Sequence, residues 1–123
     1  MKIEVSNGEI ADKLTIIEIK LAKIKDESKL VNIRNEFREL DEAIKNIIKR
    51  EDPLYQELLQ INNELWVIED DIRDCERNKD FGARFVELAR AVYFTNDRRS
   101  EVKKKINLQT GSNLVEEKSY ESY

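Results

Sequence analysis

The sequence contains no histidine, one cysteine, one proline and three glycines in 123 residues. The absence of histidine excludes Ser-His-Asp and Cys-His catalysis and zinc sites built on imidazole. The single cysteine, Cys75, excludes an internal disulfide. Because it follows Leu65, Ile68 and Ile72 at helical spacing, we expect a small buried side chain and not a reactive thiol. Glycine-rich phosphate loops are also absent, which argues against kinases and dinucleotide-binding enzymes.

Long apolar runs are missing as well, so the sequence predicts neither a signal sequence nor a membrane span. The net charge of −4 argues against a nucleic-acid partner, because such binding needs a clustered positive surface. What the chain does have is 40% hydrophobic and 39% charged residues, which suits long amphipathic helices around one core. We therefore expect one cytoplasmic domain over residues 1–123, with no cofactor and no membrane partner.

Four helices are predicted between the few residues that interrupt helices, which are Gly8, Pro53, Gly82 and Gly111. Apolar residues between them recur at spacings of three and four, as in amphipathic helices. The predicted helices cover about residues 7–25, 27–50, 53–77 and 81–108, and residues 109–123 form an irregular tail. Since the connections are short, consecutive helices must turn back on one another. This predicts an all-α antiparallel bundle, either up-down-up-down or built from paired helical hairpins.

Polar residues that can cap a helix precede each predicted helix. Ser6 and Glu9 have the spacing of a capping box, and the later helices can be capped by Asp26, Asp52 and Asp80.

The ends of the chain leave two alternatives open. Residues 2–5 alternate in polarity, so a short strand pair can form at the termini, or the tail can pack on Ile16 and Ile19.

The first predicted helix is apolar on more than one side. Its main stripe runs through Leu14, Ile17 and Leu21, whereas Ile16 and Ile19 lie away from it. This helix should therefore be central or touch another subunit, which makes a homo-oligomer the expected state. The second helix has only a narrow apolar seam in a charged surface, so we expect it at the periphery.

The third and fourth predicted helices carry polar residues where apolar ones are expected. Asn62 and Glu69 lie between two apolar columns, close to Trp66, and Arg73 follows Glu69 by one helical turn. On the fourth helix Thr95 and Arg99 interrupt the apolar stripe. Beside them are Tyr93, Asn96 and Lys103. Polar groups facing a core are costly unless they are paired or functional, so these positions mark a candidate site.

Two interpretations of this site remain open. If Arg99 and Lys103 meet Glu69 across an antiparallel hairpin, two cations face one carboxylate and can hold a phosphorylated or carboxylated small molecule. Glu69 or Asp70 would then be the base or Mg²⁺ ligand of any catalysis. The ligand-binding prediction comprises Asn62, Trp66, Glu69, Asp70, Arg73, Tyr93, Asn96, Asp97, Arg99 and Lys103. Alternatively, the same residues form a satisfied polar network that fixes helix register.

Four segments carry a resemblance, namely GEIADKLTIIEIK (8–20), LWVIEDDIR (65–73), YFTNDRR (93–99) and LVEEKSY (114–120). They resemble a family of uncharacterised bacterial and phage proteins catalogued as a domain of unknown function. Members of that family sometimes occur beside glycosyltransferase genes or domains, so the resemblance implies surface-polysaccharide metabolism. It also marks motif residues without an assigned role: Asp12, Lys13, Glu18, Lys20, Asp70 and Asp97.

The best prediction is binding of a sugar phosphate or nucleotide sugar between the third and fourth helices. One alternative is a homo-oligomeric adaptor that docks a larger enzyme, with the polar residues setting register. Another is a Mg²⁺-dependent all-α nucleotide pyrophosphohydrolase. Its carboxylates would be Glu36, Glu39 and Glu42, but the pattern places these on a charged outer face.

Overall fold

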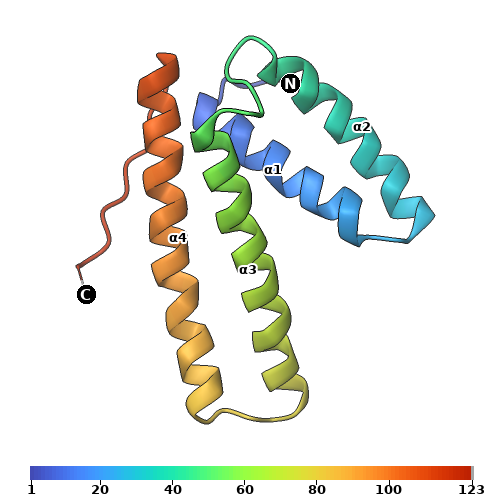
Figure 1. The fold of residues 1–123 in the computed structure, drawn as a ribbon, viewed down its shortest axis with the longest axis vertical. Coiled ribbons are helices and arrows are strands. Elements are labelled where there is room, and N and C mark those ends of the chain that lie inside the picture. The colour runs from blue at the N-terminus through green and yellow to red at the C-terminus, as the bar shows by residue number, and fades with distance from the viewer. Residues whose placement is uncertain (123) are drawn as a thin grey trace.

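The computed structural model describes residues 1–122 and consists of four α-helices. They are α1 (Asn7–Lys23), α2 (Glu27–Ile44), α3 (Pro53–Arg77) and α4 (Ala83–Thr110). Figure 1 shows two helical hairpins, α1 with α2 and α3 with α4, of which the second extends well beyond the first. The predicted all-α class is confirmed, and the arrangement is that of paired hairpins. The strand pair predicted at the termini is wrong, because residues 1–122 contain no strand.

Local capping explains where three of the helices begin. Ser6, Asp26 and Asp52 each accept a hydrogen bond from a backbone N–H in the first turn of α1, α2 and α3. The cap predicted for α4 is wrong, because Gly82 occupies that position and makes no side-chain cap. Asp80 instead accepts a hydrogen bond from the Gly82 N–H at 3.1 Å, which closes the loop before the helix.

The ends of the helices depend on the chain beyond them. α2 ends at Ile44, earlier than the predicted residue 50, and the chain then turns toward α3. Ile48 in this turn is nevertheless buried, so the apolar pattern continues where the helix does not. α4 ends at Thr110 and is capped by Gly111, whose φ of 65° lies in the left-handed region that glycine adopts without a steric penalty.

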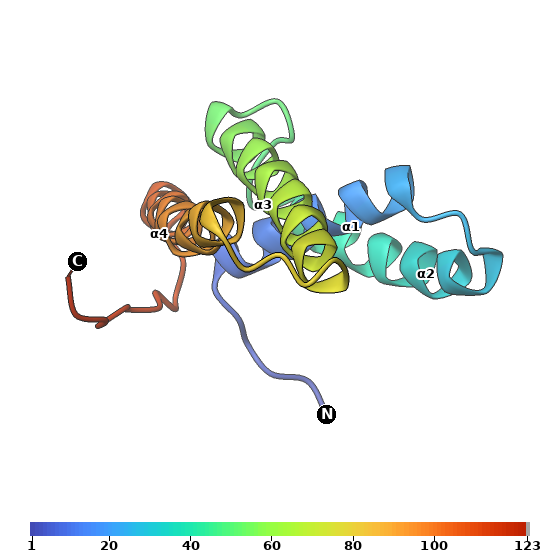
Figure 2. The same cartoon turned by 90° about the horizontal axis from the view of Figure 1, so that it is seen from below.

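The core lies where α1 crosses the α3–α4 hairpin. α1 packs against all three other helices, whereas α2 contacts only α1 among the helices of residues 1–122. Figure 2 shows the same order from below, with α2 at the edge. The core includes Leu14 of α1, Leu58 of α3 and Ile106 of α4. Of the two alternatives expected for this helix, the structure shows the central position, and Ile19 is only 4% exposed within a single chain.

Close approach of two backbones fixes the beginning of α1 against α4. The Gly8 N–H donates to the Asn107 Oδ1 at 2.6 Å. A Cβ atom at Gly8 would lie 2.5 Å from the carbonyl oxygen of Lys103 and 2.9 Å from that Oδ1. Since backbone cannot yield as a flexible side chain can, only glycine fits at this crossing.

We predict that Gly8→Ala destabilises the protein by about 1–3 kcal/mol, because α1 must move away from α4 to accommodate the methyl group. Urea unfolding followed by circular dichroism measures the loss. Gly82→Ala is the matched control, since the nearest atom to its added Cβ would be the Asp80 Oδ1 at 3.4 Å. Equal stability of the two variants would contradict the close approach.

A buried tyrosine ties α3 to α1 and to the turn after α2. Tyr55 is fully buried and its hydroxyl donates to the Glu18 Oε2 at 2.6 Å. Arg50 lies 3.5 Å from Glu18 and 2.9 Å from Asp41, with its guanidinium 5.1 Å from the centroid of the Phe37 ring. Burial and the hydrogen bond to Glu18 raise the pKa of Tyr55, because both favour the neutral phenol.

This shift predicts a loss of stability in alkali. A raised pKa in the folded state means that the folded chain holds the Tyr55 proton more tightly than the unfolded chain. The contribution is therefore complete below the ordinary tyrosine pKa of about 10 and decreases as the pH rises above it. Because Tyr55 keeps its proton while the chain is folded, the tyrosinate absorbance of the native wild type and of native Tyr55→Phe should rise by the same amplitude as the pH is raised. A smaller native amplitude for Tyr55→Phe would contradict the prediction.

Candidate functional site

Asp12 is the centre of a polar cluster between α1, α3 and α4. Its side chain is 1% exposed and forms a two-point ion pair with Arg99, in which the Arg99 Nε donates to Oδ1 at 2.8 Å and Nη2 donates to Oδ2. The Asn62 Nδ2 donates to the same Oδ1 at 2.9 Å and to the Thr15 Oγ1 at 2.8 Å. The buried carboxylate is thus satisfied by groups from two other helices.

A second ion pair lies beside the first. The Lys103 Nζ is 2.6 Å from the Glu9 Oε2 and 4.0 Å from the Asp12 Oδ2. The hydrogen bond from Arg99 to Asp12 raises the pKa of the guanidinium, and the charges of Asp12 and Glu9 act in the same direction. Arg99 therefore stays charged, and the carboxylates of α1 hold the side chains of Arg99 and Lys103 in fixed positions.

The structure brings together some of the predicted site residues and separates others. Asn62, Arg99 and Lys103 meet in the cluster, and the Asn96 Oδ1 lies 3.5 Å from the Arg99 Nη1. The predicted meeting of Glu69 with Arg99 and Lys103 is wrong, because the carboxylates of α1 occupy that position. Glu69 instead pairs with Arg73 on the surface of α3.

The remaining predicted residues divide between α3 and α4. Trp66 is half-buried and Asp70 is exposed, both on the part of α3 beyond the cluster. Tyr93 and Asp97 line a groove along α4, described below. Asp12, which the resemblance marks without a role, and Thr15 were not among the predicted site residues, although both are polar residues next to the apolar stripe of the first helix. Gly8 and Asn107 were missed because nothing in the spacing of either helix indicates their contact.

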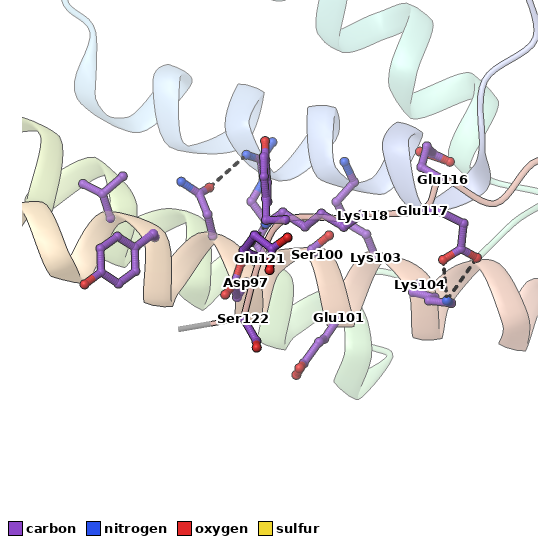
Figure 3. Close-up of a pocket in the computed structure, with 15 residues that line it drawn as sticks. Asp97, Ser100, Glu101, Lys103, Lys104, Glu116, Glu117, Lys118, Glu121 and Ser122 are labelled. Carbon is purple, nitrogen blue, oxygen red and sulfur yellow. Dashed lines mark hydrogen bonds and ion pairs between the residues drawn. The ribbon is translucent and has the colours of Figure 1, made fainter.

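A groove of about 1000 Å³ runs between α4 and the C-terminal segment, residues 112–122. We call it the tail groove. Figure 3 shows the segment passing over α4, with Lys104 opposite Glu117. The α4 side includes Tyr93, Asn96, Asp97, Arg99, Ser100, Lys103 and Lys104, and the opposite side includes Glu116, Glu117, Lys118 and Tyr120. The partly exposed edges of the Arg99 and Lys103 side chains, at 29% and 20%, form its floor.

Polar contacts hold the C-terminal segment in place. The Lys104 Nζ donates to both carboxylate oxygens of Glu117, at 3.1 and 3.0 Å, and the Lys118 Nζ donates to Asp97 at 2.8 Å. Nearer its beginning, the Ser6 hydroxyl donates to Glu116 at 2.6 Å. These contacts place the segment along α4. None of them is to Ile16 or Ile19, on which the segment was alternatively expected to pack.

The acidic residues proposed for a metal site do not gather. Within residues 1–122 no group of three histidine, cysteine, aspartate or glutamate side chains is placed to hold a metal ion. Glu36, Glu39 and Glu42 are exposed on α2, where Glu42 pairs with Lys45.

Within residues 1–122, no helix combines the length and the apolar character needed to cross a bilayer.

We predict that Asp12→Asn destabilises the fold by about 3 kcal/mol, because it leaves Arg99 partly buried without its counter-ion. Glu69→Gln is the control, since it removes an exposed ion pair with one helical turn between its members and should cost less than about 1 kcal/mol. Urea unfolding of both variants measures the difference. Similar losses would show that the buried pair does not hold the three helices together.

Comparison with known proteins identifies a family and no activity. The model of a family of unknown function, DUF6165, matches residues 1–123. No curated protein and no solved structure matches the chain. Because the match extends over the whole sequence, the chain belongs to this family of unknown function.

Proposed function

We propose that the chain binds a small anionic ligand in the tail groove, of the sugar phosphate or nucleotide sugar type. The observation that carries this proposal is the position of Glu117. Its carboxylate, which comes from the chain itself, lies against Lys104 and accepts two hydrogen bonds from one ammonium group. A phosphate group carries at least as much negative charge and offers more acceptor oxygens, so it can replace Glu117 at that place.

The floor of the tail groove is a second feature that favours the binding of an anion. Arg99 and Lys103 are fixed by Asp12 and Glu9, so no side-chain entropy is lost when a ligand approaches their exposed edges. Their charges are largely balanced by these carboxylates, which makes Lys104 the main cation for the ligand. Ser100 and Asn96 add neutral hydrogen-bonding groups of the kind that sugar hydroxyls require.

Binding, without a chemical step, is the extent of the proposal. Glu69 and Asp70, the predicted bases, belong to α3 and are not among the residues that line the tail groove. The ligand class follows the resemblance to proteins found beside glycosyltransferases, while the position of the site follows the contact between Lys104 and Glu117.

The C-terminal segment competes with the ligand in this proposal. Its ion pairs with Lys104 and Asp97 are on the surface, with the side chain of Glu117 73% exposed. Exposed pairs of this kind contribute only about 0–1 kcal/mol each. A phosphorylated ligand can therefore displace the Glu117 carboxylate at small cost while the rest of the segment stays in place.

Two substitutions at one ion pair should change ligand affinity in opposite directions. Lys104→Gln removes the cation and should weaken binding about fivefold or more, whereas Glu117→Gln removes the competitor and should strengthen it. Isothermal titration calorimetry with inorganic phosphate, glucose 1-phosphate and UDP-glucose measures both effects on the full chain.

Lys105→Gln is the matched control, because Lys105 is the next residue on α4, is exposed and does not line the tail groove. It should leave the affinity unchanged. Binding that weakens equally in Lys104→Gln and Lys105→Gln would indicate a general charge effect and overturn the site. Absence of heat with all three probes, in the wild type and in Glu117→Gln, would overturn the proposed ligand class.

A further inference from the structure

The outer half of the α3–α4 hairpin lacks the cover that the inner half has. We call residues 66–92 the arm. The core cluster contains no residue between Leu65 of α3 and Val102 of α4. Among residues 66–101, only Cys75 and Thr95 are buried. Figure 1 shows why, since α1 crosses the opposite end of the hairpin and α2 lies beyond α1.

The arm nevertheless has the apolar pattern of a helix that packs on others. Phe81, Phe85, Leu88 and Val92 follow each other at spacings of three and four, and Ile68 and Ile72 lie opposite on α3. All of these except Phe81 are half-buried, and Phe81 is 52% exposed. Two helices alone cannot enclose such a seam, because each buries only the side that faces the other.

Charge on the arm divides between the two helices. Residues 66–77 of α3 carry five acidic and two basic side chains, whereas residues 83–92 of α4 carry two basic and one acidic. Within the chain this division already produces cross-helix pairs, with Arg84 lying 3.4 Å from Asp74 and 3.9 Å from Asp71. The acidic α3 surface is also unsuited to an anionic lipid surface.

We propose that a second copy of this chain covers the arm, with α3 of each copy packed against α4 of the other. Two arms related by a two-fold axis along their length form a four-helix bundle in which every neighbouring pair is antiparallel. Each acidic α3 then lies between two basic α4 helices. The contact between the copies thus pairs acidic α3 with basic α4, as Arg84 and Asp74 do within one copy. The tips of the two arms meet at the same end of the bundle.

Sedimentation velocity of the full chain over a concentration series tests this arrangement. The wild type should sediment as a dimer that dissociates on dilution. Phe81→Glu should raise the dimer Kd at least about tenfold, because a charge would be buried at the tip. The control is Val31→Glu on α2, which alters a residue outside the arm whose exposure, 51%, is close to the 52% of Phe81. A monomer at every concentration, or equal weakening by Val31→Glu, would overturn the proposal.

Cross-linking tests the same surface without a destabilising charge. In Phe81→Cys the two new thiols would be adjacent at the tips, so mild oxidation should give a covalent dimer on a non-reducing gel. Cys75 is fully buried and provides no competing thiol. Val31→Cys should remain monomeric on the gel. A wild type that sediments as a dimer while Phe81→Cys fails to cross-link would overturn the parallel arrangement of the arms.

Discussion

The rest of the structure depends on the burial of one charge, that of Asp12. A carboxylate with 1% exposure is tolerated only where hydrogen bonds and a counter-ion replace water, and here they come from Asn62 on α3 and Arg99 on α4. Satisfying Asp12 therefore fixes α1 at one height across the hairpin. The contact at Gly8 and the pairing of Glu9 with Lys103 follow, because both lie within one turn of Asp12 on the same helix. Such a pair contributes more to the choice of register than to net stability.

The same cluster gives α4 two different surfaces. Near the C-terminal end of α4, α1 covers one side of the helix and the C-terminal segment crosses another. Arg99 and Lys103 are therefore part of the fold and also the floor of the tail groove. Near its N-terminal end, α4 packs only on α3 among the helices of residues 1–122. A ligand in the groove and a second copy on the arm would therefore occupy successive parts of one helix, which meet at Val92.

The sequence predicted what depends on neighbouring residues and missed what depends on distant ones. Helix spacing and capping are local, so the all-α class was predictable, as were the caps Ser6, Asp26 and Asp52. A helical wheel also shows that Asn62 and Arg99 face inward, but not which helix they face. The partner of Arg99 is Asp12, which is 87 residues away, and Glu69 appeared equally suitable on spacing alone. The path of the C-terminal segment depends on exposed ion pairs, which leave no periodic signal.

Helix length explains why the hairpin has an arm at all. α1 has 17 residues, whereas α3 and α4 have 25 and 28. At 1.5 Å per residue, α1 is roughly 25 Å long and α4 roughly 40 Å, so α1 cannot cover the hairpin even if it lay parallel to it. Because α1 crosses at the height that Asp12 requires, all of the excess length lies on one side. Apolar side chains left in water there cost about 25 cal/mol per Å². Within residues 1–122 no further helix lies over them, and this is the physical ground for the contact proposed between two arms.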